Sequence, residues 1–331
     1  MLDVLRFWGR GAARRTQIAI AWLASATMRT TLRLLLLLPC SLPLLLAGCG
    51  PTSPSGNVSA YDDDDDRDDD DDATEAPPPE LPGYSGDACP TMEQGWNAGW
   101  MSSGLERDFR LELPDEPEGA PLIITWHWLG GTADQAFDWV GLDAMVDAGA
   151  VVISPQSRGL PVEWDSGGSP NGNDDLTLFD DLLTCAWEQY GIDTERVHTF
   201  GMSAGGLWTT YLTMHRSTWL ASTAPLSGGA DANSYVTPEV DVPVLLTWGG
   251  PTDTYGPYSF DVSSRYFSDA LRADGHFVAE CLHGGGHTIP QGAADYLWSW
   301  FDAHERGQDP DPFAEGLSGD FPGFCGLDMT P

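Results

Sequence analysis

Short apolar runs alternate with longer amphipathic stretches from about residue 89 onward, and this alternation limits the fold more than any other feature. Apolar runs of roughly four to eight residues are typical of buried strands, and the longer stretches between them are typical of helices. Strands and helices in regular alternation form a mostly parallel sheet that helices cover. The sequence therefore predicts an α/β protein.

The expected elements follow from this pattern. The predicted strands are 109–113, 122–128, 150–155, 196–202, 222–228, 242–249 and 276–282. The predicted helices are 133–148, 174–190, 204–215, 259–273 and 290–305. Asp174 and Asp175 are expected to cap the second helix, because short carboxylate side chains accept hydrogen bonds from free amides there. In such sheets ligands bind beyond the carboxyl ends of the strands, so functional residues should follow strands.

The first 49 residues are typical of an export signal and stand apart from the fold. Arg29 and Arg33 precede an apolar run at 34–46, and the letters LAGC follow it and end at Cys49. A run of about 13 residues is too short for a spanning helix, which needs about 20. LAGC resembles a bacterial lipobox, which implies that Cys49 carries lipid as the first mature residue. Met28 is then a sensible start; an uncleaved amphipathic anchor is the alternative.

Composition changes abruptly after the signal. Residues 50–88 include ten aspartates at 62–72 among prolines and serines, and a segment so poor in apolar groups cannot bury enough surface to fold. We expect an acidic, disordered tether, followed by one domain at 89–331. That domain carries 8 arginines, 36 acidic residues and no lysine. Its negative field argues against nucleic-acid partners and polyanions.

Four cysteines fall in the predicted domain: Cys89, Cys185, Cys281 and Cys325. In an exported chain an even number indicates two disulfides, and three pairings remain open; free buried thiols are the alternative. The wide spacings match no zinc-binding pattern.

A nucleophile is predicted at Ser203, where a strand ends in HTFGMSAGGLW and a helix begins. The surrounding Gly201, Gly205 and Gly206 suit a strained turn that brings strand and helix close together. Because G-x-S-x-G also arises by chance in a glycine-rich chain, the assignment depends on a base and an acid elsewhere.

His287 and Asp253 are the expected partners, since each follows a predicted strand. A serine hydroxyl needs a base to remove its proton, and a carboxylate orients that base. His283 still belongs to a strand end and is expected to pack or bind the loop, and Asp261 falls inside a predicted helix. A metal site from His283 and His287 is disfavoured, because three glycines between them oppose a helix. The order serine, aspartate, histidine is that of α/β-hydrolases.

The chain from about Cys89 to Cys325 resembles secreted esterases of the polyhydroxybutyrate depolymerase and feruloyl esterase group, a branch of the α/β-hydrolases. The matching segments are DTERVHTFGMSAGG, WGGPTD, CLHGGGHTIP and a late FPGFC. The resemblance implies an α/β-hydrolase fold with Ser203 as nucleophile, Asp253 as acid and His287 as base.

The oxyanion of such a reaction needs two amide donors. The geometry of a nucleophile elbow supplies one from Ala204, and the second is expected from the segment HWLGGTADQ after the strand at 122–128. The resembling family has His-Gly at this point, whereas Trp128 follows His127 here. Alignment to the family favours Leu129 as the second donor, with Trp128 as the other choice.

These observations predict a lipid-anchored serine esterase that acts outside the cytoplasm as a monomer. The expected location is the outer membrane, on its periplasmic side or at the cell surface, with the lipid as the only membrane contact. No cofactor or metal is expected. The expected substrates are neutral polyesters or feruloyl or acetyl esters of plant polysaccharide, with aromatic binding residues at Trp128, Trp164, Trp208 and Trp248. A peptidase on the same scaffold and a catalytically silent binding lipoprotein are the alternatives.

Overall fold

The computed structural model describes residues 79–159 and 162–329 of the chain. These residues fall within one compact unit, Asp72–Pro331. The predicted export signal, Cys49 and the aspartate run lie outside the described residues.

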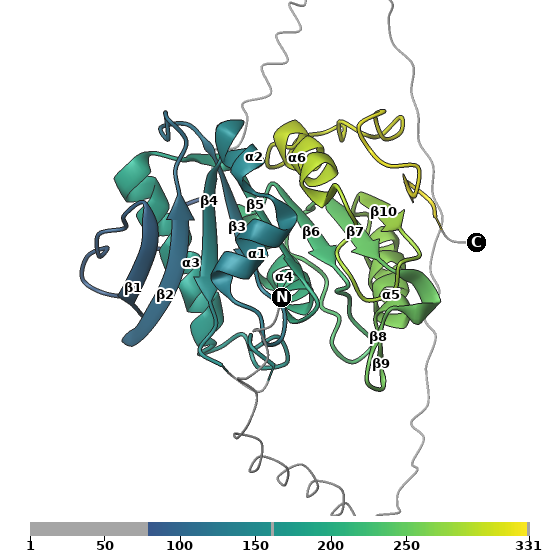
Figure 1. The fold of residues 1–331 in the computed structure, drawn as a ribbon, viewed down its shortest axis with the longest axis horizontal. Coiled ribbons are helices and arrows are strands. Elements are labelled where there is room, and N and C mark those ends of the chain that lie inside the picture. Colours follow the sequence, from purple (N-terminus) through teal and green to yellow (C-terminus); the bar gives the residue numbers. More distant parts are fainter. Residues whose placement is uncertain (1–78, 160–161, 330–331) are drawn as a thin grey trace, which may run out of the picture. The chain divides into compact units, whose positions relative to one another are not determined.

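A nine-stranded mixed sheet forms the centre of this unit (Figure 1). Its strand order is β1-β2-β4-β3-β5-β6-β7-β10-β11, and the six strands from β4 to β10 are parallel. The antiparallel strands β1, β2 and β11 lie at the two edges. The strand bounds are β1 Gly95–Ser102, β2 Leu105–Glu112, β3 Pro121–Trp126, β4 Val151–Gln156, β5 Asp193–Met202, β6 Ser222–Leu226, β7 Val244–Trp248, β10 Val278–Leu282 and β11 Cys325–Gly326.

Helices cover both faces of the sheet, as Figure 1 shows. One face packs against α3 (Asp174–Tyr190), α4 (Ala204–Arg216) and α5 (Phe260–Ala273). The other packs against α1 (Ala133–Val140), α2 (Asp143–Asp147) and α6 (Ala293–Ala303). Successive strand residues point to opposite faces, so adjacent apolar residues of one strand enter different cores.

Strand β3 shows this division of the core. Leu122, Ile124 and Trp126 pack with the α3, α4 and α5 side, whereas Ile123 packs with the opposite side. A strand buried on both faces is apolar at most positions, which explains the nearly continuous apolar runs in the sequence. The predicted α/β architecture, a mostly parallel sheet that helices cover on both faces, is confirmed.

The observed elements depart from the predicted ones at few places. The predicted helix 133–148 is two helices, because Gly141 takes a left-handed φ of 83° and its amide caps α1 by donating to Phe137. Asn173 caps α3 in place of the expected Asp174 and Asp175, which lie in the first turn instead. The sequence pattern also missed the edge strands β1 and β11 and the hairpin formed by β8 (Thr254–Tyr255) and β9 (Tyr258–Ser259).

Packed structure begins before Cys89, within the segment predicted as a tether. Ser85 donates from its amide and its hydroxyl to Asp181, and Tyr84 donates to the carbonyl of Met101. These contacts hold the segment against α3 and β1.

Two disulfides join the four cysteines. Cys89 pairs with Cys185 of α3, and Cys281 of β10 pairs with Cys325 of β11. The first secures the entry of the chain to α3, and the second ties the C-terminal segment to the sheet.

Within residues 79–159 and 162–329, no helix has the length and apolar character needed to cross a membrane.

Buried histidines make folding sensitive to acid. Burial lowers the pKa of His198 well below its ordinary value, and the nearby His304 and Arg196 lower it further. His198 is fully buried, stacks on Phe301 and bonds through Nδ1 to the hydroxyl of Ser222. Below about pH 6.5 His198 binds a proton in the unfolded chain but stays neutral in the folded chain. The free energy of unfolding therefore falls as pH drops below about 6.5.

We predict that His198→Asn weakens this pH dependence, since the asparagine amide reaches Ser222 without titrating. Wild type should lose up to about 1.4 kcal/mol per pH unit through this group between about pH 6.5 and 5.5. Urea unfolding at pH 7.5 and 5.5 measures the difference. An unchanged loss in the variant would show that His198 does not contribute.

Candidate active site

Ser203 occupies a strained turn between β5 and α4. Its backbone has φ 59° and ψ −114°, a conformation that costs a residue with a side chain roughly 1–3 kcal/mol. Two hydrogen bonds hold the turn: the Ser203 amide donates to Leu226, and the Leu207 amide donates to Ser203. The side chain is placed at the carboxyl end of a central strand.

Missing side chains permit this turn. A Cβ on Gly205 would lie 1.9 Å from the carbonyl oxygen of Trp126, and one on Gly206 would lie 2.2 Å from that of Leu226. Both neighbours are backbone atoms that cannot move aside, so glycine is required. Helix α4 can therefore start directly against the neighbouring strands β3 and β6.

His287 lies in the loop after β10, with its imidazole between Ser203 and Asp253. Its Nε2 is 2.9 Å from Ser203 Oγ, and its Nδ1 is 2.7 Å from Asp253 Oδ1. The ring stacks on Phe260 with centroids 4.5 Å apart and planes 14° from parallel. Gly249 lets this loop approach, because a Cβ there would lie 1.9 Å from the carbonyl oxygen of Gly286. The structure thus brings the three predicted residues together.

Asp253 is fully buried after the short 3-10 helix that follows β7. Its second oxygen, Oδ2, accepts hydrogen bonds of 2.8 Å from Ser227 Oγ and from the Gly249 amide. Burial opposes the charged form, but the bonds from His287, Gly249 and Ser227 outweigh it. The pKa of Asp253 consequently lies below its ordinary value. A permanent carboxylate at neutral pH faces the imidazole.

Ser227 was missed by the sequence analysis. It directly follows β6 and has a positive φ of 45°, and its side chain is turned toward Asp253. The available signal was its position: a hydroxyl residue at the carboxyl end of a predicted strand, next to two glycines.

The turn after β3 contains the two residues considered as oxyanion donors. The Gly131 amide donates to the carbonyl of Trp128 at 2.8 Å and closes the turn. The Gly130 amide donates to Glu163 at 2.9 Å. The amide of Leu129, the residue before Gly130, has no acceptor in the described part of the chain. Ala204 is the first residue of α4, so its amide has no partner within the helix.

A cavity of about 450 Å³ opens beside Ser203 and His287. Aromatic side chains form one wall, where Trp128 stacks on the exposed Trp139 with centroids 4.7 Å apart, and Tyr255 lines the cavity as well. The other lining residues are Leu129, Val140, Met202, Thr288, Ile289, Pro290, Gln291, Gly292 and Ala293. Among the described residues, no aspartate, glutamate or arginine lines this cavity.

Three of the four tryptophans expected at the rim are core residues instead. Trp164, Trp208 and Trp248 are fully buried. Trp164 and Trp208 pack edge-on against Trp126, and the indole of Trp248 donates to Asp261. Trp248 ends β7, Trp208 lies within α4 and Trp164 follows β4, and all three side chains belong to the core on the α3, α4 and α5 side of the sheet. Of the four, only Trp128 lines the cavity.

His283 and Asp261, the other candidates for base and acid, make no hydrogen bond to Ser203, His287 or Asp253. His283 accepts a bond from the Gly285 amide within its own loop. Asp261 sits in the first turn of α5 and binds Trp248 and Arg265. In the part of the chain that the structure describes, no group of three or more histidine, cysteine or acidic side chains could hold a metal ion.

Comparisons with known proteins agree with this architecture. No family model matches the chain. A putative esterase, NocK, of Nocardia uniformis is 28% identical over 44% of this chain and 45% of its own. A probable feruloyl esterase C of Aspergillus terreus is 27% identical over 37% of this chain and 47% of its own. The chain thus spans about half the length of these two relatives.

Longer matches cover most of the folded part. An oxidized polyvinyl alcohol hydrolase of a Sphingopyxis strain is 24% identical over 68% of this chain and 84% of its own. The solved structure of native sOPH superposes with a TM-score of 0.60 at 19% identity, over 72% of this chain and 95% of its own. A thermostable esterase superposes with a TM-score of 0.51 at 19% identity, over 64% of this chain and 63% of its own. The chain therefore has the predicted α/β-hydrolase fold, and the relatives that it resembles in sequence are named as esterases and hydrolases.

Proposed function

We propose that this protein is a carboxylic ester hydrolase with Ser203 as nucleophile, His287 as base and Asp253 as the carboxylate that orients it. The observation that carries the proposal is the unbroken contact from Ser203 Oγ through the imidazole to the buried Asp253, beside an uncharged cavity. The named esterases among the relatives support the same reaction class.

The reaction proceeds in two halves. Ser203 Oγ attacks the ester carbonyl carbon while His287 Nε2 takes the hydroxyl proton, and the Asp253 carboxylate stabilises the imidazolium. The proton then passes to the leaving alcohol oxygen, and the carbon–oxygen bond breaks to leave an acyl-serine. Water attacks this acyl group by the same proton route and releases the acid.

The developing oxyanion is assigned to the amides of Ala204 and Leu129. Ala204 directly follows the attacking serine, and Leu129 lines the cavity beside it. Neither amide donates a hydrogen bond to another atom of the described residues. Two fixed donors of this kind lower the barrier without reorganisation at the moment of reaction. Trp128 supplies its ring to the cavity and its carbonyl to the turn.

We predict that Ser203→Ala lowers kcat for p-nitrophenyl acetate by about 10³-fold or more and abolishes labelling by a fluorophosphonate probe. Ser318→Ala, on an exposed serine away from the cavity, is the matched control and should behave as wild type. Circular dichroism checks the fold. Full activity in Ser203→Ala would exclude the mechanism, and a wild type that resists the probe would favour a silent binding protein.

We propose that the cavity beside Ser203 binds neutral acyl groups. The cavity lining carries no fixed charge in the described chain, and the paired rings of Trp128 and Trp139 offer a flat apolar wall. The names of the relatives mention feruloyl esters, acetylxylan and oxidized polyvinyl alcohol. The esterase names support esters of plant polysaccharide ahead of peptides, and polyesters stay in the proposal on the resemblance of the sequence alone.

We predict that Trp139→Ala lowers kcat/KM for p-nitrophenyl hexanoate about tenfold, because a longer acyl chain loses its apolar wall. The acetate ester, which is too short to use the wall, should change by less than about twofold. Trp187→Ala is the control, since Trp187 is also exposed but lies on α3 outside the cavity. An equal loss of kcat/KM for both esters would show that the acyl chain does not bind against Trp139.

Export and lipid anchoring complete the proposal. The two disulfides suit an oxidising compartment outside the cytoplasm. The anchor rests on the LAGC sequence, and Cys49 lies outside the described residues.

We predict that the full chain incorporates a fatty-acid label in bacteria and that Cys49→Ala abolishes the incorporation. Cys40→Ala, nine residues upstream within the apolar run at 34–46, should keep it. Label that persists in Cys49→Ala would refute anchoring at this position.

A further inference from the structure

The turn after β3, residues 127–131, is held by hydrogen bonds with another segment of the chain. Its only internal backbone bond among the described contacts joins Gly131 to Trp128. Three bonds reach it from the segment after β4: Trp164 Nε1 donates to the His127 carbonyl at 2.9 Å, Ser157 N donates to His127 Nε2 at 3.0 Å, and Gly130 N donates to Glu163. The shape of the turn therefore depends on this second segment.

Glu163 is the residue that bridges the two segments. One carboxylate oxygen accepts from the Gly130 amide at 2.9 Å, and the other accepts from the Ser157 hydroxyl. Glu163 itself has a φ of 67°, in the left-handed region that disfavours a side chain. A strained backbone of this kind persists only where surrounding contacts hold it in place. The hydrogen bonds of the Glu163 side chain are such contacts.

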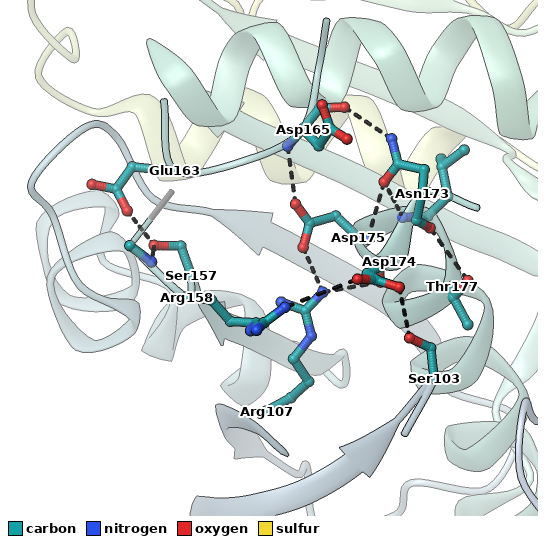
Figure 2. A network of polar contacts seen from close by, with 12 residues as sticks. Ser103, Arg107, Ser157, Arg158, Glu163, Asp165, Asn173, Asp174, Asp175 and Thr177 are labelled. Atoms are coloured by element: carbon teal, nitrogen blue, oxygen red, sulfur yellow. Dashed lines mark hydrogen bonds and ion pairs between the residues drawn. The ribbon is translucent and has the colours of Figure 1, made fainter. Parts of the chain in front are cut away.

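A buried ion pair holds the backbone of Asp165, two residues after Glu163. Arg107 and Asp175 are both buried and bind one another, and the free oxygen of Asp175 accepts from the Asp165 amide at 2.9 Å. Asn173 donates to the Asp165 carbonyl from the start of α3. Figure 2 shows this network, with Glu163 reaching Ser157 on one side and Asp165 held on the other.

His127 contributes in its neutral form. Burial lowers the pKa of His127, so at neutral pH its Nε2 is free to accept from the Ser157 amide. The remaining proton on Nδ1 then donates to the Trp128 carbonyl at 2.9 Å. Both ring nitrogens are thus spent on holding the turn.

We propose that Glu163 is a positioning residue: by engaging the Gly130 amide, it orients the turn so that the preceding Leu129 amide stays free as the oxyanion donor. This inference rests on the proposed esterase function. Glu163 acts through the turn and does not touch the substrate. Its work requires an acceptor atom at the correct reach, and negative charge is not needed.

A pair of conservative variants separates reach from charge. Glu163→Gln keeps an oxygen that reaches Gly130 N and an NH₂ that reaches Ser157 Oγ, but loses the charge. Glu163→Asp keeps the charge but is one methylene too short to reach the amide. Glu106→Ala, on an exposed glutamate of β2, is the control.

Kinetics with p-nitrophenyl acetate give the first readout. We expect Glu163→Asp to lower kcat by about 10- to 100-fold with KM within about twofold, whereas Glu163→Gln stays within about threefold of wild type. A boronic acid that forms a tetrahedral adduct on Ser203 should bind Glu163→Asp more weakly by the same factor as kcat/KM. Loss of general stability alone would not reproduce this match.

Other outcomes overturn the proposal. Wild-type kinetics in Glu163→Asp, or a Glu163→Gln variant as impaired as Glu163→Asp, would show that reach to Gly130 is not what matters. Failure of the esterase function is distinguishable, because wild type would then neither hydrolyse the ester nor react with the fluorophosphonate probe.

Discussion

Close backbone approach is the constraint on which the site depends. Helix α4 starts so near β3 and β6 that Gly205 and Gly206 have room for hydrogen only. The same close approach recurs where the histidine loop meets the end of β7, because a Cβ on Gly249 would collide with the carbonyl oxygen of Gly286. The glycines thereby allow two segments far apart in the chain, one with Ser203 and one with His287, to pack closely against the ends of the strands. The positions of the reacting atoms follow from the packing of the main chain.

The sequence predicted the central architecture because each core strand is buried on both faces. Such strands are apolar at most positions, so runs such as those at β3 and β7 stand out from the amphipathic helices between them. The positions of Ser203, Asp253 and His287 just after strands were visible for the same reason. Their assigned roles remain part of the proposal, while the structure brings the three side chains into contact.

Other features escaped prediction for physical reasons. Nearness to a strand end does not tell which way a side chain points, so Trp164, Trp208 and Trp248 were placed at a rim when they fill the core. Trp139 lies within a predicted helix, and only the fold stacks it on Trp128. Edge strand β1 alternates irregularly, since a shift in its pairing with β2 interrupts the period of two. The pattern of apolar residues therefore carried no clear strand signal there.

The hairpin of β8 and β9 shows where this scaffold can change without harm. Directly beyond Asp253 the chain leaves for the hairpin, and the Phe260 amide closes the excursion by donating to the Asp253 carbonyl at 2.9 Å. Phe260 then starts α5 beneath the imidazole. Because the hairpin is shut off at its base, insertions at its tip carry only a small loop-closure penalty. The exposed Tyr255 side of the cavity is thus free to diversify in length and chemistry while the acid and its histidine keep their spacing.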